Sequence, residues 1–197
     1  MDIKRLSRQT CRLLQPPGVV SWASVAGRLE RQGPLGAYFD ITDDDSFVGK
    51  KTWEQGEAEM QAMALRRALQ KGGLTPEDVD CVFAGDLLNQ NIGATFSLRD
   101  FAIPFYGVYG ACSTMGESLS LAAMAVAGGF PRLAAAQTAA LRDDAVGEAA
   151  DGVIVEIHVG QRGEKAVRQQ PRDLRRVFLP RLTDLRQTDQ AAHQRIL

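Results

Sequence analysis

Cys112 is the side chain of this sequence best placed, by type and position, to take part in chemistry. It falls in the run ACSTMGE at residues 111–117, between an apolar run ending at Gly110 and a helical pattern beginning at Met115. A cysteine that opens a helix has its sulfur near unsatisfied backbone N–H groups and the positive end of the dipole, and both favour the thiolate. The strand-to-helix turn directs the side chain toward the carboxyl end of the sheet, where open α/β sheets bind ligands. The competing interpretation is a small buried hydrophobe.

A second polar group follows the preceding predicted strand, in the run GDLLNQN at residues 85–91. The carboxyl ends of adjacent parallel strands meet at one edge of a sheet. We therefore expect Asp86, Asn89 and Gln90 to line the same crevice as Cys112 and Ser113. Their donors, acceptors and single charge suit the recognition of a small polar molecule. The alternative is an Asx-rich turn whose side chains cap their own backbone, and the spacing does not separate the two.

The elements that must position these residues follow from the hydrophobic periodicity. A helix is predicted over Trp53–Lys71, where apolar residues recur at helical spacing and Gly72-Gly73 follows. A second helix, from Met115, is apolar on every side, which predicts a buried helix. The remaining predicted elements are strands at 19–26, 80–84, 104–110, 132–138 and 153–159, a helical turn at 75–78, and a short helix at 95–100. Because strands and helices alternate, we expect a parallel sheet with right-handed crossovers.

Candidate metal ligands are few. The acidic run Asp43-Asp44-Asp45 favours a solvated loop, with a cation site as the alternative. With no C-x-x-C pair and two histidines, no zinc-type cluster is expected and the thiols are interpreted as reduced. His158 and His193 both lie in the stretch 141–197, in which we recognise no motif, and they are interpreted as incidental surface side chains, so neither is assigned as a base. The three cysteines are Cys11, Cys81 and Cys112.

Composition sets broad limits on function. An apolar fraction of 45% and a charged fraction of 24% are typical of a soluble globular protein. The net charge of -1 gives no reason to expect nucleic acid as a partner. The basic N-terminus lacks the apolar run of a signal peptide, and the weakly polar stretch Leu119–Phe130 is too short to span a bilayer. We therefore expect an intracellular protein whose membrane association, if any, is peripheral.

The stretch Trp53–Phe130 closely resembles the stage V sporulation protein AD family of spore-forming Firmicutes. The residues that carry the resemblance form long, near-identical runs rather than a loose pattern. These runs are GPLG at 33–36, AGDLLNQN at 84–91, IPF at 103–105, GACSTMGES at 110–118 and GGF at 128–130. The run TPED at 75–78, with Asp80, is a looser signature shared with thiolases and ketoacyl synthases.

The resemblance implies a thiolase-like layered α-β-α fold, of which residues 1–140 would form the N-terminal half. It also implies a sporulation and germination protein that binds dipicolinic acid, usually as its calcium chelate, and assists its movement across the spore inner membrane. Its partners would be membrane-embedded proteins of the same operon, and its location peripheral to that membrane. Calcium is expected only as part of the ligand, and no other cofactor is expected. Because thiolase-like folds usually pair, a homodimer is expected as well.

The resemblance also implies an alternative function, since Cys112 falls where thiolase-like enzymes keep their nucleophile. An acyltransferase of this type needs a histidine and a further partner from the second half of the fold to activate the thiol and stabilise an oxyanion. Residues 141–197 show no family motif and are rich in Arg and Gln, which predicts a truncated or frameshifted chain with a disordered polar tail. We therefore expect a binding protein and not an enzyme. A chain without function, aggregating through its uncovered apolar face, is the third alternative.

Overall fold

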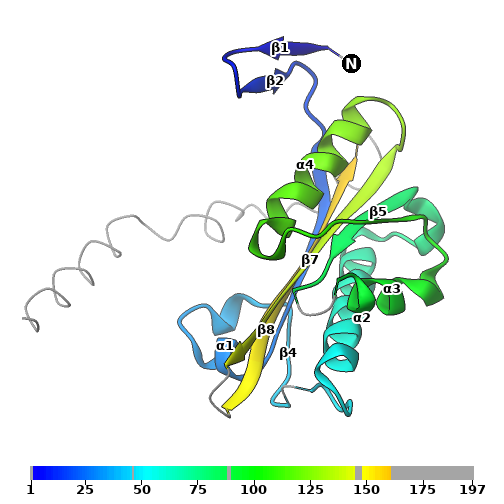
Figure 1. The fold of residues 1–197 in the computed structure, drawn as a ribbon. Coiled ribbons are helices and arrows are strands. Elements are labelled where there is room, and N and C mark those ends of the chain that lie inside the picture. The colour runs from blue at the N-terminus through cyan, green and yellow to red at the C-terminus, as the bar shows by residue number, and fades with distance from the viewer. Residues whose placement is uncertain (1, 46, 88–89, 145–147, 161–197) are drawn as a thin grey trace, which may run out of the picture. The chain divides into compact units, whose positions relative to one another are not determined.

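A six-stranded mixed sheet is the centre of the fold in the computed structural model, which describes residues 2–45, 47–87, 90–144 and 148–160 (Figure 1). Its strand order is β4-β3-β8-β7-β5-β6. The strands are β3 (Gly18–Ala26), β4 (Ile41–Thr42), β5 (Cys81–Gly85), β6 (Phe105–Gly107), β7 (Leu133–Asp144) and β8 (Glu148–Gly160). The strands predicted within residues 19–26, 80–84, 104–110, 132–138 and 153–159 are thereby confirmed, with different bounds.

The direction of β8 departs from the expected parallel sheet. β5 pairs in parallel with β6 and β7, and β3 pairs in parallel with β4. β8, however, runs antiparallel to both of its neighbours, β3 and β7. Only three residues separate Asp144 from Glu148, and a connection that short cannot make the crossover that parallel neighbours require. The prediction of a purely parallel sheet was therefore wrong.

The sheet also continues further along the chain than the sequence pattern indicated. The predicted boundary at residue 140 falls inside β7, and β8 pairs along almost its whole length with β7. The stretch up to Gly160 therefore belongs to the sheet, because its backbone completes the ladder between β7 and β3. The rest of the predicted polar tail, residues 161–197, lies outside the described residues.

Helices cover both faces of the sheet (Figure 1). Alternate residues of β5 and β7 face opposite layers, as the two-residue period of a strand requires. Val82, Ala84 and Ala135 pack with Leu65 of α2 (Trp53–Gly72) and with α3 (Ile92–Leu98). On the other face, Cys81, Ala134 and Ala136 pack with Ala122 and Val126 of α4 (Thr114–Ala127). The parity of a strand residue therefore decides which helical layer it meets.

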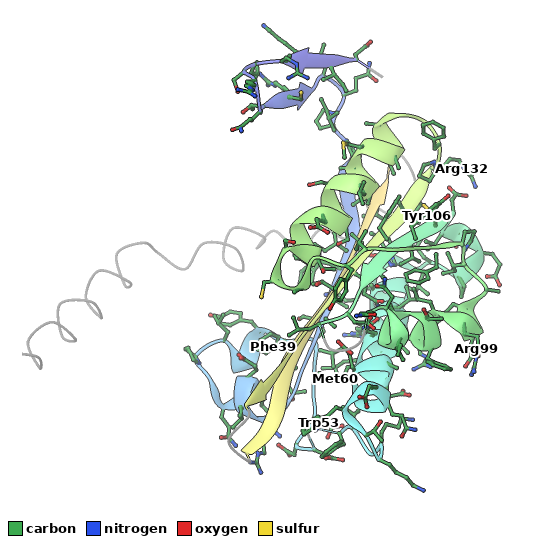
Figure 2. The ribbon with its side chains drawn as sticks, in the orientation of Figure 1. Phe39, Trp53, Met60, Arg99, Tyr106 and Arg132 are labelled. Carbon is green, nitrogen blue, oxygen red and sulfur yellow. The ribbon has the colours of Figure 1, made fainter. Side chains whose placement is uncertain are left out.

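The longest helix, α2, matches its prediction to within one residue. Thr52 Oγ1 accepts a hydrogen bond from the Gln55 N–H at 3.3 Å and caps its start, and Gly73, at φ 63°, ends it in the left-handed conformation that glycine tolerates. Met60, labelled in Figure 2, is among its buried side chains. The short helical segments are α1 (Arg28–Gln32), η1 (Gly36–Tyr38), η2 (Pro76–Asp78), η3 (Arg99–Phe101) and η4 (Ala111–Ser113).

Two helices differ from expectation. α3 begins at Ile92, before the predicted start at Thr95, and η3 completes the predicted stretch. α4 is not buried on every side: its buried residues form the single stripe Thr114, Ser118, Ala122 and Val126. Leu121 and Met124 are exposed. An apolar sequence therefore did not guarantee burial, because only one face of α4 has a sheet to pack against.

A separate two-stranded antiparallel sheet precedes the main one. It consists of β1 (Ile3–Arg5) and β2 (Cys11–Leu13). Every residue of the two strands is exposed except Leu13, which is half-buried. Among the described residues, no helix is long and apolar enough to cross a membrane.

Candidate functional site

The predicted turn at Cys112 is confirmed. After β6 the chain crosses the end of β5, where the Val108 N–H donates to the Ala84 carbonyl oxygen at 2.9 Å. The turn η4 then leads directly into α4, and Cys112 is exposed at this junction. Ala111, just before it, has a φ of 48°, which marks the sharp change of direction. The fold therefore presents this thiol to solvent at the N-terminal end of a 14-residue helix.

Ser113, the neighbouring site residue, is held by two acceptors. Its Oγ lies 2.8 Å from the Gly110 carbonyl oxygen and 2.6 Å from Glu117 Oε1. The single hydroxyl proton can be donated to only one of them at a time. The Gly110 N–H in turn donates to Thr114 Oγ1 at 3.3 Å. These contacts fix the turn and place the Glu117 carboxylate beside Ser113.

An open groove runs along α4 from Cys112. Its volume is about 670 Å³. One end is polar, with a thiol, hydroxyls and one carboxylate, and the other end is apolar. The lining residues are Cys112, Ser113, Gly116, Glu117, Ser120, Leu121 and Met124.

Asp86 does not join Cys112 in this groove. It continues the parity of Val82 and Ala84, so it enters the layer of α2 and α3, on the opposite face of the sheet from α4. The side chain is fully buried. Its carboxylate accepts hydrogen bonds from the Gly93 N–H at 2.6 Å, the Ala94 N–H at 2.7 Å and Gln61 Nε2 at 3.2 Å. Burial raises the pKa of Asp86 above its ordinary value, although these three donors oppose the rise.

Asp86 belongs to a buried polar cluster that sequence reasoning missed. Glu57 Oε1 accepts a hydrogen bond from the Leu87 N–H at 3.1 Å, so this carboxylate and that of Asp86 hold the two ends of the segment between β5 and α3. Gln137 Nε2 donates to the Gln61 carbonyl oxygen at 2.9 Å. A signal was present in the sequence: Glu57 and Gln61, four apart, fall on the apolar stripe of the long helix with Met60 and Ala64.

The remaining predicted site residues lie after β5. Gln90 is exposed and has a φ of 47°, whereas Asn89 lies outside the described residues. The two segments do meet at one edge of the sheet: a Cβ at Gly107 would lie 2.9 Å from Asn91 Nδ2, and a Cβ at Gly85 would overlap the Val108 carbonyl oxygen. The two segments therefore meet at one edge of the sheet, as predicted, but Asp86 does not line the groove beside Cys112.

The acidic run from Asp43 to Asp45 caps its own loop. Asp45 accepts hydrogen bonds from the N–H groups of Phe47 at 3.0 Å and Gly49 at 2.7 Å, which lower its pKa. Asp43 Oδ1 accepts one from the Asp45 N–H at 2.8 Å. The described part of the chain holds no group of three or more histidine, cysteine, aspartate or glutamate side chains able to bind a metal ion.

The interpretation of His158 as a surface residue was wrong. Its side chain is fully buried, and Nδ1 lies 3.0 Å from Ser21 Oγ. The reason is the unpredicted pairing of β8 inside the sheet, which gives His158 a position between β3 and β7. His193 lies outside the described residues.

Cys81 is buried, and desolvation raises the pKa of its thiol to about 11.

The described residues have a thiolase-like fold. The chain is similar to MvaS solved in complex with 3-hydroxy-3-methylglutaryl coenzyme A, with a TM-score of 0.51 and 14% identity over 74% of this chain and 40% of that one. It is also similar to the HMG synthase of the curacin biosynthetic pathway, with a TM-score of 0.50 and 11% identity over 75% of this chain and 41% of that one. At these identities the likeness concerns the fold alone.

Within that class, the chain belongs to the stage V sporulation protein AD family, whose model matches residues 7–145. The stage V sporulation protein AD of Bacillus subtilis (strain 168) is 42% identical over 136 residues. This match covers 69% of the present chain and 40% of that protein, so the chain spans less than half the length of its relative. The family is one of sporulation proteins.

Proposed function

We propose that this chain acts in sporulation and germination by binding dipicolinic acid, and that the groove beside Cys112 is the part of the ligand site found in the described residues. The observation that carries the proposal is the exposure of Cys112 and Ser113 at the N-terminal end of α4, in a groove of about 670 Å³. A small aromatic dicarboxylate suits a site of that size and mixed polarity.

The groove offers a partner for each part of this ligand. The positive end of the α4 dipole favours a carboxylate near Cys112, and the hydroxyl of Ser120 supplies a donor. Leu121 and Met124 supply an apolar wall for the flat ring. The Glu117 carboxylate would repel a bare dianion. The calcium chelate is therefore favoured, because its cation can lie between the ligand carboxylates and that of Glu117. The carboxylate of the groove is Glu117, whereas Asp86, the carboxylate predicted to lie beside Cys112, is buried against α2 and α3.

The experiment is calorimetry of the purified chain with dipicolinate, with and without calcium. We expect binding, and tighter binding when calcium is present. Leu121→Asp should weaken it by about tenfold, which corresponds to about 1.4 kcal/mol. Ile92→Asp is the matched control, because Ile92 is an exposed apolar residue of α3 on the opposite layer. Absence of heat from folded protein in both titrations would refute the proposal.

Acyl transfer is the second candidate, favoured by the accessible thiol of Cys112 at the start of a helix in a thiolase-like fold. Such catalysis needs a base beside the thiol. Among the described residues that line the groove, none carries an imidazole. Alkylation with iodoacetamide as a function of pH separates the candidates: a nucleophilic Cys112 reacts well below the pH at which an ordinary thiol does. Ordinary reactivity, with no acyl-enzyme in the mass spectrum, argues for binding alone.

The proposal includes a location peripheral to the spore inner membrane, beside membrane-embedded proteins of the same operon. This part rests on the family to which the chain belongs. A homodimer also stays a prediction, and analytical ultracentrifugation of the purified chain tests it.

A further inference from the structure

The hairpin of β1 and β2 has an unusual distribution of charge. Backbone pairing joins Ile3 to Leu13, Lys4 to Arg12 and Arg5 to Cys11. The Leu14 N–H donates to the Asp2 carbonyl oxygen at 2.9 Å, and the Leu6 N–H to the Thr10 carbonyl oxygen at 2.9 Å, so the ladder extends by one pair at each end. Within residues 2–14, four basic side chains accompany one acidic one, whereas the whole chain has a net charge of -1.

Two cationic side chains lie opposite each other on one face of the hairpin. Because side chains alternate along a strand, Lys4 and Arg12 lie directly opposite on the same face. Like charges directly opposite each other destabilise a strand pair, and an anionic partner would relieve that repulsion. By the same parity, Leu6 and Leu14 flank the two cations, and both leucines are more than half exposed, at 55% and 54%. The same face also carries Asp2 opposite Leu14 and Thr10 opposite Leu6. It is therefore a pair of cations with a leucine at each end and one carboxylate, and its net charge is positive.

The hairpin also lacks a core of its own. Two strands alone are marginally stable in water, and they need an apolar surface or further strands for independent stability. Here the apolar residues Ile3, Leu6 and Leu14 are exposed, and the strands form a sheet separate from the main one. A partner that is both anionic and apolar would satisfy the cations and cover the leucines.

We propose that this hairpin face docks on an anionic lipid bilayer. Lys4 and Arg12 contact lipid phosphates, and Leu6 and Leu14 enter the interface between headgroups and acyl chains. An anionic membrane surface presents negative charge and apolar depth together, which a nucleic acid does not. The inference rests on the proposed membrane location and assigns a surface to it, but it does not depend on the binding of dipicolinate.

The test is co-sedimentation of the full chain with vesicles, either of phosphatidylcholine alone or of phosphatidylcholine with phosphatidylglycerol. We expect binding only to the anionic vesicles, weakening as salt is raised. Lys4→Ala combined with Arg12→Ala should lower the partition coefficient by roughly 30-fold, the effect of two cations at an anionic surface. Leu6→Ala combined with Leu14→Ala should also lower it, while leaving the salt dependence in place.

The matched control removes two exposed cations elsewhere, Arg28→Ala with Lys51→Ala, and should bind as the unchanged chain does. The inference is overturned if anionic vesicles do not bind the chain, if neutral vesicles bind it equally, or if the control pair loses as much binding as the hairpin pair. It is also overturned if the hairpin variants lose affinity for duplex DNA, or lose self-association, but keep their binding to vesicles. Calorimetry with dipicolinate on the same variants reports the ligand site separately.

Discussion

Two segments that meet at one edge of the sheet have opposite characters. The end of β5 delivers Asp86 into the layer of α2 and α3, where its carboxylate is fully buried and holds three donors. The segment after β6 delivers Cys112 to solvent beside α4. Two polar residues that look equally suited to a ligand site in the sequence therefore have different roles. Asp86 stabilises the buried layer, and Cys112 is exposed to solvent. For Asp86, the parity of its position directly after β5 decides the outcome, because it continues the series Val82 and Ala84.

Among the substitutions that compare the two segments, Asp86→Ala is expected to change the free energy of unfolding most. It leaves the N–H groups of Gly93 and Ala94 buried without their acceptor, so we expect the free energy of unfolding to fall by about 3 kcal/mol. Urea denaturation measures it. Ser120→Ala in the groove is the control and should change stability little. A loss of stability no greater for Asp86→Ala than for Ser120→Ala would mean that Asp86 is not a structural carboxylate.

Gly85→Ala tests the point where the two segments touch. The added methyl group would overlap the Val108 carbonyl oxygen, so the backbone that leads to Cys112 must move. We expect a loss of about 2 kcal/mol of stability, as for other overpacked sites, together with altered alkylation of Cys112. Gly116→Ala is the control, because a Cβ there would have nothing within 4 Å. Equal stability of the two variants would contradict the contact.

The pH dependence of stability tests the buried carboxyl group. Since burial raises the pKa of Asp86 above 3.8, the folded state keeps its proton where the unfolded chain releases it. The stability that this raised pKa contributes is therefore complete below pH 3.8 and is lost as pH rises through the folded-state pKa, whereas the hydrogen bonds to Gly93 and Ala94 remain. Asp86→Asn cannot ionise, so the stability of the unchanged chain should fall relative to this variant over that interval. Urea titrations from below pH 3.8 to neutrality measure the difference, and a constant difference would contradict the raised pKa.

The smallest effect on stability is expected at Cys112. Because the thiol is exposed, Cys112→Ser should change the free energy of unfolding by less than about 0.5 kcal/mol. Thiol titration of the folded chain should find Cys11 and Cys112 accessible and Cys81 protected, since Cys81 is buried and its pKa is about 11. A large loss of stability in Cys112→Ser would place this residue in the core.

Much of the fold could be predicted from the sequence because its elements have strong local signals. The start of the long helix at Trp53, its end at the glycine pair and the turn at Cys112 are local features, and each lies where the pattern indicated. The direction of β8 depends on strands that are distant in the sequence. An apolar run predicts a strand, but it does not predict which strands it pairs with. The same limit explains His158, whose burial follows from that pairing.

The candidate site could be predicted only in part, for a related reason. The sequence correctly predicted that Asp86 and Cys112 lie at the same edge of the sheet, but it did not predict that they lie on opposite faces of it. Counting the alternation from Val82 through Ala84 to Asp86 would have separated them, because that series is buried against α2 and α3. Glu117, four residues after Ser113, was overlooked because its role depends on a helical contact with that serine.

The central claim is that dipicolinate binds on the Cys112 side of the sheet, and ligand protection of thiols tests it most directly. The folded chain is treated with iodoacetamide, with and without calcium and dipicolinate, and the modification of each cysteine is followed by mass spectrometry. Cys11, exposed on β2 and not part of the groove, is the internal control. We predict that the ligand slows the alkylation of Cys112 and leaves that of Cys11 unchanged. Equal rates at Cys112 with and without saturating ligand would contradict the claim.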